Sequence, residues 1–162
     1  KMDEQFELQA KVTLKEGFEY NSLQASDIFI EKADENLFPE INRFRTDDEL
    51  VKIYQIQSVD GKPYCVHELI TYMEKDINKE RLKNLESVYD LLGRKGINNL
   101  QFMNNIITIE SPSDIISKYF PEVDTLLLSR RMVLLNKIAI GLERFFIRTD
   151  LTKVEFAGEL VI

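Results

Sequence analysis

Cys65 and His67 are the two side chains best suited to nucleophilic or acid–base chemistry, and they stand two residues apart in the sequence. Alternation along a strand places both on one face. A separation of two residues on a strand is a poor geometry for directed proton transfer from thiol to imidazole. No Gly-x-Ser-x-Gly sequence presents a serine that His67 could activate. We therefore do not expect catalysis by these groups.

Metal and cofactor chemistry is also poorly supported. The chain has one cysteine and one histidine, which nearly excludes a zinc site. The sequence "GRKG" at 93–96 is typical of a helix end rather than of a phosphate-binding loop. The carboxylates are spread along the chain, and no pair stands out as an acid–base couple. We expect no metal and no cofactor.

Arg130 and Arg131 interrupt the apolar run "LLLSRRMVLL", so alternation sends one arginine to each face of the predicted strand. A buried guanidinium needs a carboxylate or a ligand anion as its partner. The other interpretation is an edge strand on which both arginines reach water. Glu143, Arg144 and Arg148 on the next predicted strand could form cross-strand ion pairs rather than a binding site.

Composition limits the function classes. A chain of 162 residues with 44% hydrophobic content suggests one globular domain. The net charge of −7 argues against binding of nucleic acid by this chain alone, because phosphates need a basic surface. No apolar run reaches the roughly 20 residues of a membrane span. A single cysteine fits a reducing compartment, so we expect a cytoplasmic protein.

The clearest elements are two strands, "ELVKIYQIQSV" and "KPYCVHELITYM", joined by a type I′ turn at Asp60-Gly61. The first strand carries Gln55 and Gln57. With a regular two-residue turn, these glutamines share a face with Glu68. A β-bulge in the hairpin would place His67 on that face instead.

Strands dominate the remaining chain, and helices are few. Further strands are predicted at "SDIFIEKA", "LQFMNNIITIE", "TLLLSRRMVLL", "IAIGLERFFIR" and "KVEFAGELVI", with turns at Asn136-Lys137 and Thr149-Asp150. Helices are predicted near Pro39, at "ESVYDLLGRKG" with a cap at Glu86 or Ser87 and a stop at Gly93 or Gly96, and after a cap at Ser111 with Pro112 in the first turn. This pattern predicts an α+β fold with a mostly antiparallel sheet and a few inserted helices. We expect an N-terminal arm or linker over residues 1–24 and a folded domain over 25–162.

The order and spacing of "QIQSVDGKP", "ESVYDLL", "RRMVLL" and "IRTD" resemble the UbiC transcription regulator-associated (UTRA) domain. That domain is the effector-binding half of HutC-type regulators in the GntR family, and its fold is similar to chorismate lyase. The resemblance covers roughly residues 25–158. It implies a chorismate lyase-like fold, a small-molecule metabolite as effector and a homodimer. It implies a transcription regulator that contacts operator DNA only through a separate N-terminal winged helix–turn–helix, which is not in this chain.

The resemblance also implies a set of site residues. The family often has Arg-x-Arg where this chain has Gln55 and Gln57, and a glutamate at the position of His67, next to Glu68. The implied ligand-binding set is Gln55, Gln57, His67, Glu68, Ser87, Tyr89, Asn104 (or its neighbour Asn105), Arg131 and Glu143. The family alignment favours His67 over Glu68 as the residue that faces the ligand.

The glutamines are a departure from the family pattern. Two arginines suit a phosphate, whereas two neutral amides both donate and accept hydrogen bonds. We therefore expect a polar metabolite that is neutral or carries little charge. The resemblance implies a regulator domain and not an enzyme. The alternatives are a chorismate lyase-like enzyme, which would need cations for its dicarboxylate, and a protein-interaction domain whose pocket has degenerated.

Overall fold

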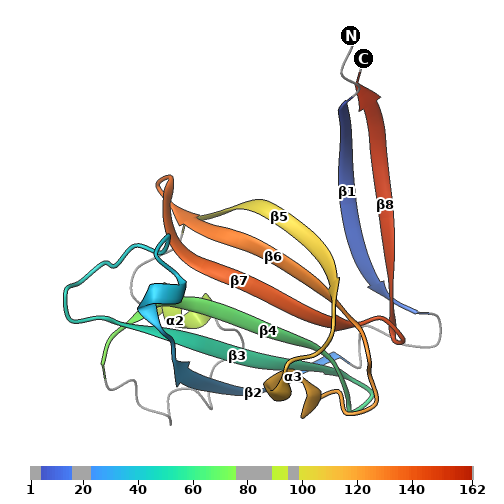
Figure 1. Ribbon diagram of the computed structural model, residues 1–162, viewed down its shortest axis with the longest axis horizontal. Helices are drawn as coiled ribbons and strands as arrows, with labels where there is room; N and C mark the ends of the chain where they lie inside the picture. Colours follow the sequence, from blue (N-terminus) through green and yellow to red (C-terminus); the bar gives the residue numbers. More distant parts are fainter. Residues whose placement is uncertain (1–4, 16–22, 76–88, 95–98, 162) are drawn as a thin grey trace.

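The structure is a computed structural model that describes residues 5–15, 23–75, 89–94 and 99–161. Its main sheet has six antiparallel strands in the order β2-β3-β4-β7-β6-β5, and β1 pairs with β8 in a separate ribbon (Figure 1). The elements are β1 (Gln5–Leu14), β2 (Leu23–Lys32), η2 (Glu35–Leu37), β3 (Glu49–Val59), β4 (Lys62–Met73), α2 (Tyr89–Arg94), β5 (Leu100–Glu110), α3 (Asp114–Ser117), β6 (Leu126–Leu135), β7 (Ile138–Arg148) and β8 (Thr152–Val161). The predicted α+β class with a mostly antiparallel sheet is confirmed.

Two tight turns join the central hairpins, as predicted. Asp60 and Gly61, between β3 and β4, have φ values of 50° and 75°. Asn136 and Lys137, between β6 and β7, have φ values of 49° and 66°. Positive φ at both central residues is the geometry of a type I′ turn, whose twist matches that of the flanking strands.

A β-bulge changes the register of the β3–β4 hairpin. Ser58 pairs with Pro63, whereas Gln57 pairs with Cys65, so Tyr64 has no partner on β3. The extra residue shifts every later pair by one, and His67 lies directly opposite Gln55. Strict alternation had placed Glu68 on the face of the two glutamines; the bulge places His67 there.

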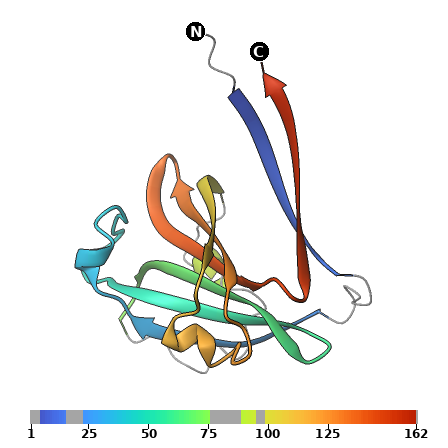
Figure 2. The same cartoon turned by 45° about the vertical axis from the view of Figure 1, so that its right-hand side comes forward.

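The main sheet is covered on both faces. On one face, the buried Leu91 and Leu92 of α2 pack with Ile53, Leu69 and neighbouring residues in one apolar cluster. On the other face, Phe38 and Ile41, which follow η2, and Ile116 and Phe120, from α3 and the turn after it, complete two further clusters. Figure 2 shows η2 at the left edge of the molecule and α3 below the middle of the sheet. The centre of this second face lies between them.

The short helices differ from the prediction in their ends. Before Pro39 there is only the single 3-10 turn η2, capped by Asp34, whose carboxylate accepts from the Asn36 N–H at 3.0 Å. The cap predicted at Ser111 is wrong, because α3 begins at Asp114 and Ser113 is its N-cap. Gly93 does not stop α2, which continues to Arg94. The caps predicted at Glu86 or Ser87, and the stop at Gly96, lie outside the described residues.

The ribbon of β1 and β8 projects from one end of the main sheet (Figures 1 and 2), and its register pairs Gln5 with Val161. Its ladder continues at the base, where the Lys15 N–H donates to the Leu151 carbonyl at 3.0 Å. The residues expected to form an N-terminal arm thus include a strand. The division at residue 24 into arm and domain stays a prediction.

Candidate functional site

Glu143 is the centre of a polar cluster on the face of the main sheet that carries α2. It lies on β7 between Leu69 of β4 and Arg131 of β6, and its side chain is fully buried. Its carboxylate accepts hydrogen bonds from the Tyr89 hydroxyl and from Nε of Arg131. A buried carboxylate is stable only with such partners, so three elements (β7, β6 and α2) are tied together at this point.

Arg131 is held between the carboxylate and two aromatic rings. Its guanidinium carbon lies 3.9 Å from the ring centroid of Phe102 and 5.3 Å from that of Phe145, and a terminal nitrogen donates to the Tyr89 hydroxyl at 3.2 Å. These contacts favour a planar guanidinium over a lysine ammonium. The side chain keeps 29% of its surface exposed, so it remains accessible to a ligand.

His67 joins the cluster from β4. Its ring stacks on Phe145, with centroids 4.3 Å apart and an interplanar angle of 9°. Nε2 lies 3.0 Å from a Glu143 carboxylate oxygen, a distance that makes an ion pair only when the ring is protonated, and it has no directed hydrogen bond. Gln55, directly opposite on β3, is also buried. His67 therefore combines a buried apolar ring contact with a polar atom that lacks a directed partner.

The cluster shifts the pKa values of its members in ways that fix their charges. Burial alone raises the pKa of Glu143, but His67 and the hydrogen bonds from Tyr89 and Arg131 outweigh it, so the pKa lies below the ordinary value. Burial and the nearby carboxylate raise the pKa of the Tyr89 hydroxyl. At neutral pH the carboxylate is therefore ionised and the phenol is protonated, as a hydrogen-bond donor to that carboxylate must be.

Gln57 and Cys65 occupy the next cross-strand pair toward the turn. Gln57 is half-buried and its side-chain oxygen accepts a hydrogen bond from the hydroxyl of the bulged Tyr64 at 3.2 Å. Cys65 is buried, and burial raises the pKa of its thiol to about 12. A thiol with so high a pKa is protonated at neutral pH and is a poor nucleophile.

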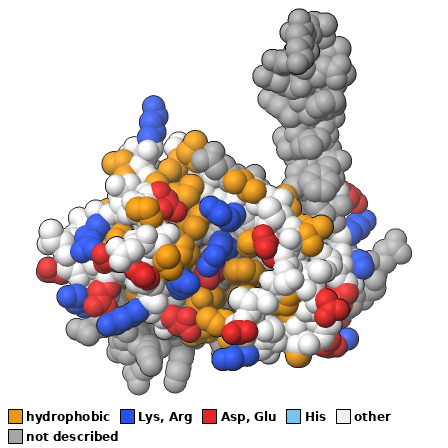
Figure 3. Space-filling model, viewed as in Figure 1, with side chains coloured by type: hydrophobic (Ala, Val, Ile, Leu, Met, Phe, Trp, Pro, Cys, Tyr) orange, Lys and Arg blue, Asp and Glu red, His pale blue; other side chains and the backbone are white. Residues whose placement is uncertain are grey.

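Glu68 lies on the opposite face of the sheet from the Glu143 cluster. It is buried beside Tyr54 of β3, and Nε of Arg144 donates to its carboxylate. Arg130 is directly opposite Arg144 on β6 and is exposed. In Figure 3, Lys and Arg side chains gather among apolar side chains near the middle of the visible face. The two adjacent arginines thus go to opposite faces, as alternation predicts, and Glu68 is not part of the Glu143 cluster.

Two residues of the implied set are not placed by the structure. Ser87 lies outside the described residues. Asn104 falls within the register irregularity of the edge strand β5, between Met103 and Ile106, and its side chain is likewise outside the description. The members that the structure brings together are Gln55, His67, Tyr89, Arg131 and Glu143, with Gln57 one pair further along β3.

The sequence reasoning missed the aromatic part of the cluster. Phe102 and Phe145 flank Arg131, and Phe145 also stacks on His67. Phe145 lies two residues from Glu143 on the same strand, so alternation was the signal that could have placed it on the same face. Phe102 could not be placed from sequence, because its position depends on the pairing of β5 with β6.

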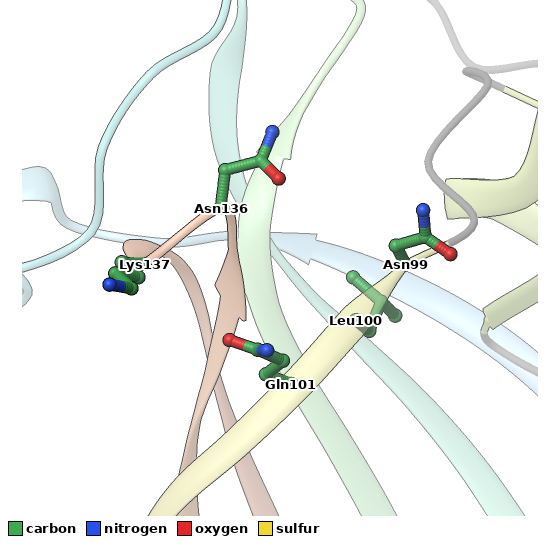
Figure 4. A pocket seen from close by; sticks show the side chains of 5 residues that line it. All are labelled: Asn99, Leu100, Gln101, Asn136 and Lys137. Atoms are coloured by element: carbon green, nitrogen blue, oxygen red, sulfur yellow. The ribbon is translucent and has the colours of Figure 1, made fainter.

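A separate hollow lies near the β6–β7 turn, away from this cluster. It has a volume of about 470 Å³ and is lined by Asn99, Leu100, Gln101, Asn136 and Lys137 (Figure 4). Its side chains are amides, one leucine and one lysine, and none belongs to the set implied by the resemblance. Within the described part of the chain, no group of three or more His, Cys, Asp or Glu residues comes together as a metal site, and no helix could span a membrane.

Comparison with known proteins gives likeness in structure but not in sequence. No protein-family model matches the chain, and no curated protein matches it in sequence. A solved ligand-binding domain of a protein assigned to the GntR family of transcriptional regulators, from Bordetella bronchiseptica, has a TM-score of 0.69 at 14% identity, over 89% of this chain and 93% of that one.

Two further solved domains are similar. The effector-binding domain of the Bacillus subtilis trehalose repressor has a TM-score of 0.55 at 18% identity, over 80% of this chain and 91% of that one. The effector domain of PhnF from Mycobacterium smegmatis has a TM-score of 0.56 at 14% identity, over 80% and 84%. The chain therefore has the fold of the effector-binding domains of GntR-family transcriptional regulators, as its resemblance to the UTRA domain implied.

Proposed function

We propose that this chain is the effector-binding and dimerising domain of a GntR-type bacterial transcription regulator, and that it binds a small polar metabolite next to the Glu143 cluster. The observation that carries the proposal is the coincidence of the shared fold with a buried polar cluster on one sheet face. A metabolite would shift the regulator between two states by binding one of them better than the other. Operator DNA would be bound through a separate winged helix–turn–helix.

The charge of the cluster supports a ligand of low net charge. Arg131 and Glu143 neutralise each other, and the Gln55 side chain is a neutral amide. A phosphate ester would have to bind beside the buried carboxylate of Glu143 with one arginine already engaged. A neutral polyol, or a zwitterion whose ammonium and carboxylate meet Glu143 and Arg131, matches the charges better. The rings of Phe102 and Phe145 give such a ligand an apolar contact.

The test is a binding screen by thermal shift, followed by calorimetry, with neutral sugars, amino acids and phosphate esters as three separate groups. We expect the strongest stabilisation from the first two groups. Gln55→Ala and Arg131→Ala should each weaken the best compound at least about tenfold, the loss of one hydrogen bond to a charged or buried group. Arg130→Ala is the matched control, because the adjacent arginine is exposed on the other face.

Unchanged affinity after both Gln55→Ala and Arg131→Ala would refute the site. A phosphate ester as the best compound would refute the charge argument while leaving the regulator domain in place. The protein is also incubated with chorismate, and conversion of chorismate to product would show that the chain is an enzyme rather than a regulator domain. Circular dichroism of each variant separates lost binding from lost folding.

A further inference from the structure

One residue from each strand of the main sheet contributes to a row across the face that carries η2 and α3. Each member of this row lies directly opposite the next one on the neighbouring strand. From β2 to β5 the row reads Phe29, Tyr54, Glu68, Arg144, Arg130 and Ile106. On β4, Ile70 on one side of the row belongs to the apolar cluster completed after η2, and Val66 on the other side belongs to the cluster completed by α3. The charged middle of the row therefore lies between two apolar clusters.

The carboxylate of Glu68 in this row is buried and already engaged. Its side chain is 2% exposed, and it accepts a hydrogen bond from Nε of Arg144. Burial and this carboxylate raise the pKa of the Tyr54 hydroxyl, which stays protonated and hydrogen-bonds to Glu68. Arg144 keeps 25% of its side chain exposed, and its terminal nitrogens form no hydrogen bond with any described residue. Arg144 is thus held in place through Nε, and its other donors are available.

Arg130 adds a second guanidinium that has no carboxylate. It is exposed and directly opposite Arg144, and like charges in such a cross-strand pair repel each other. Within the described ranges, Arg130 forms no ion pair, and its neighbours on this face, Leu128, Met132 and Ile106, are apolar. Two guanidinium groups therefore stand beside one carboxylate, although the chain as a whole has a net charge of −7. Figure 3 shows Lys and Arg side chains among apolar ones in the middle of this face.

We propose that Arg130 and Arg144 form a second small-molecule site, which binds a carboxylate that carries an apolar group. A carboxylate between the two strands can accept hydrogen bonds from both guanidinium groups and remove their repulsion. The single excess positive charge matches a monoanion. The half-buried Met132 and Phe146 and the exposed Ile106 offer the apolar group a contact. The guanidinium carbon of Arg144 lies 5.6 Å from the ring centroid of Phe146, so the charged and apolar parts of the site adjoin.

This site is separate from the Glu143 cluster, although the two share strands. Arg130 and Arg131 are adjacent on β6, and Glu143 and Arg144 are adjacent on β7, so the sheet itself lies between the two sites. The inference goes beyond the proposed function and does not rest on it. Binding at one face can fail while binding at the other is retained, and the adjacent arginines provide variants that distinguish the two outcomes.

The test is an NMR titration of the full chain with benzoate at constant ionic strength. Saturable shifts should appear at the amides of β6 and β7 around Arg130 and Arg144. We expect a dissociation constant on the order of 1–10 mM, as is usual for so small a ligand. Benzamide has the same ring without the charge and should bind at least about tenfold more weakly. Inorganic phosphate has the charge without the ring and should also bind more weakly than benzoate.

Three variants assign the binding to this face. Arg130→Gln changes an exposed residue and should weaken benzoate at least about fivefold. Arg131→Gln, at the adjacent arginine of the other face, is the matched control and should leave the dissociation constant within about twofold. Arg144 is changed only together with its partner, as Arg144→Gln with Glu68→Gln, because its loss alone would leave a buried carboxylate without a cation. This double variant should also weaken benzoate, and circular dichroism checks that it folds.

Four results would overturn the proposal. The first is the lack of saturable benzoate binding to the wild-type chain, and the second is benzamide binding as tightly as benzoate. The third is phosphate binding more tightly than benzoate, which would remove the role of the apolar flanks. The fourth is benzoate binding that Arg131→Gln weakens and Arg130→Gln leaves unchanged, which would place the ligand at the Glu143 cluster.

Discussion

Arg131 and Glu143 stand directly opposite each other on β6 and β7, and their ion pair is asymmetric. The carboxylate is fully buried, whereas the guanidinium keeps 29% of its surface exposed. The carboxylate therefore depends on the protein for every one of its hydrogen bonds, while the arginine can exchange a partner for water or a ligand. This asymmetry makes Glu143 a structural anchor and Arg131 the accessible part of the cluster.

Replacing Glu143 by glutamine should destabilise the fold. The amide keeps the shape of the side chain but removes the charge that pairs with Arg131, and one of its polar atoms must face a donor. We expect a loss of about 2 kcal/mol in the free energy of unfolding, below the full cost of a buried pair because Arg131 is partly solvated. Urea denaturation measures it. Glu40→Gln, at an exposed position, is the control and should change stability by less than about 0.5 kcal/mol.

Replacing both partners by apolar residues should separate stability from binding. Arg131→Met with Glu143→Leu removes both charges at once and leaves neither unpaired. Such replacements of buried pairs are often neutral or stabilising, so we expect a free energy of unfolding within about 1 kcal/mol of the wild-type value. The double variant should nevertheless no longer bind the best compound of the binding screen. A variant that is as unstable as Glu143→Gln would show that Tyr89 and His67, rather than Arg131, hold the carboxylate.

The free energy of unfolding should fall at acid pH, in part because Glu143 becomes protonated. Its pKa in the folded protein lies below the ordinary value, so its contribution to stability is present above the pKa of the unfolded chain, near 4.3, and is lost as the pH falls through the folded pKa. The stability difference between wild type and Glu143→Gln should therefore shrink between about pH 5 and pH 3. Urea midpoints measured across this range check it.

Asp150 has a depressed pKa as well, because Arg148 donates to both of its oxygens at 2.8 and 2.7 Å. Asp150→Asn serves as the control for the pH experiment. This variant should lose the pH dependence of stability that comes from Asp150 and keep the pH dependence that comes from Glu143. A difference between wild type and Glu143→Gln that stays constant with pH would contradict the assignment of the depressed pKa to Glu143.

Lys137→Gly should stabilise the β6–β7 hairpin. Lys137 has a φ of 66°, a left-handed conformation that costs a residue with a Cβ about 1 kcal/mol relative to glycine. Because the position is exposed, little packing is lost, and we expect a gain of about 0.5–1 kcal/mol in unfolding free energy. Lys137→Ala should give no gain, since it removes the charge and keeps the Cβ. Equal stability of the glycine and alanine variants would show that the turn carries no strain.

The main hairpins could be predicted closely from sequence. β3 and β4 match the predicted segments because Asp60-Gly61 fixes the turn and the flanking residues have strong strand propensity. The helices were harder. α3 is a short helix whose N-cap, Ser113, lies two residues after the predicted Ser111, and because both residues are serines, cap propensity alone does not separate them.

The sequence by itself determined the class of fold, the positions of the central hairpins along the chain, and the split of Arg130 and Arg131 between two faces, because turn chemistry and alternation act locally. Only the tertiary structure decided which residues meet. The bulge at Tyr64 put His67 opposite Gln55, and the pairing of β4, β7 and β6 gathered His67, Glu143 and Arg131. A single extra residue reverses the face of every residue after it, and strand order depends on the burial of whole faces; neither effect is visible in a local pattern.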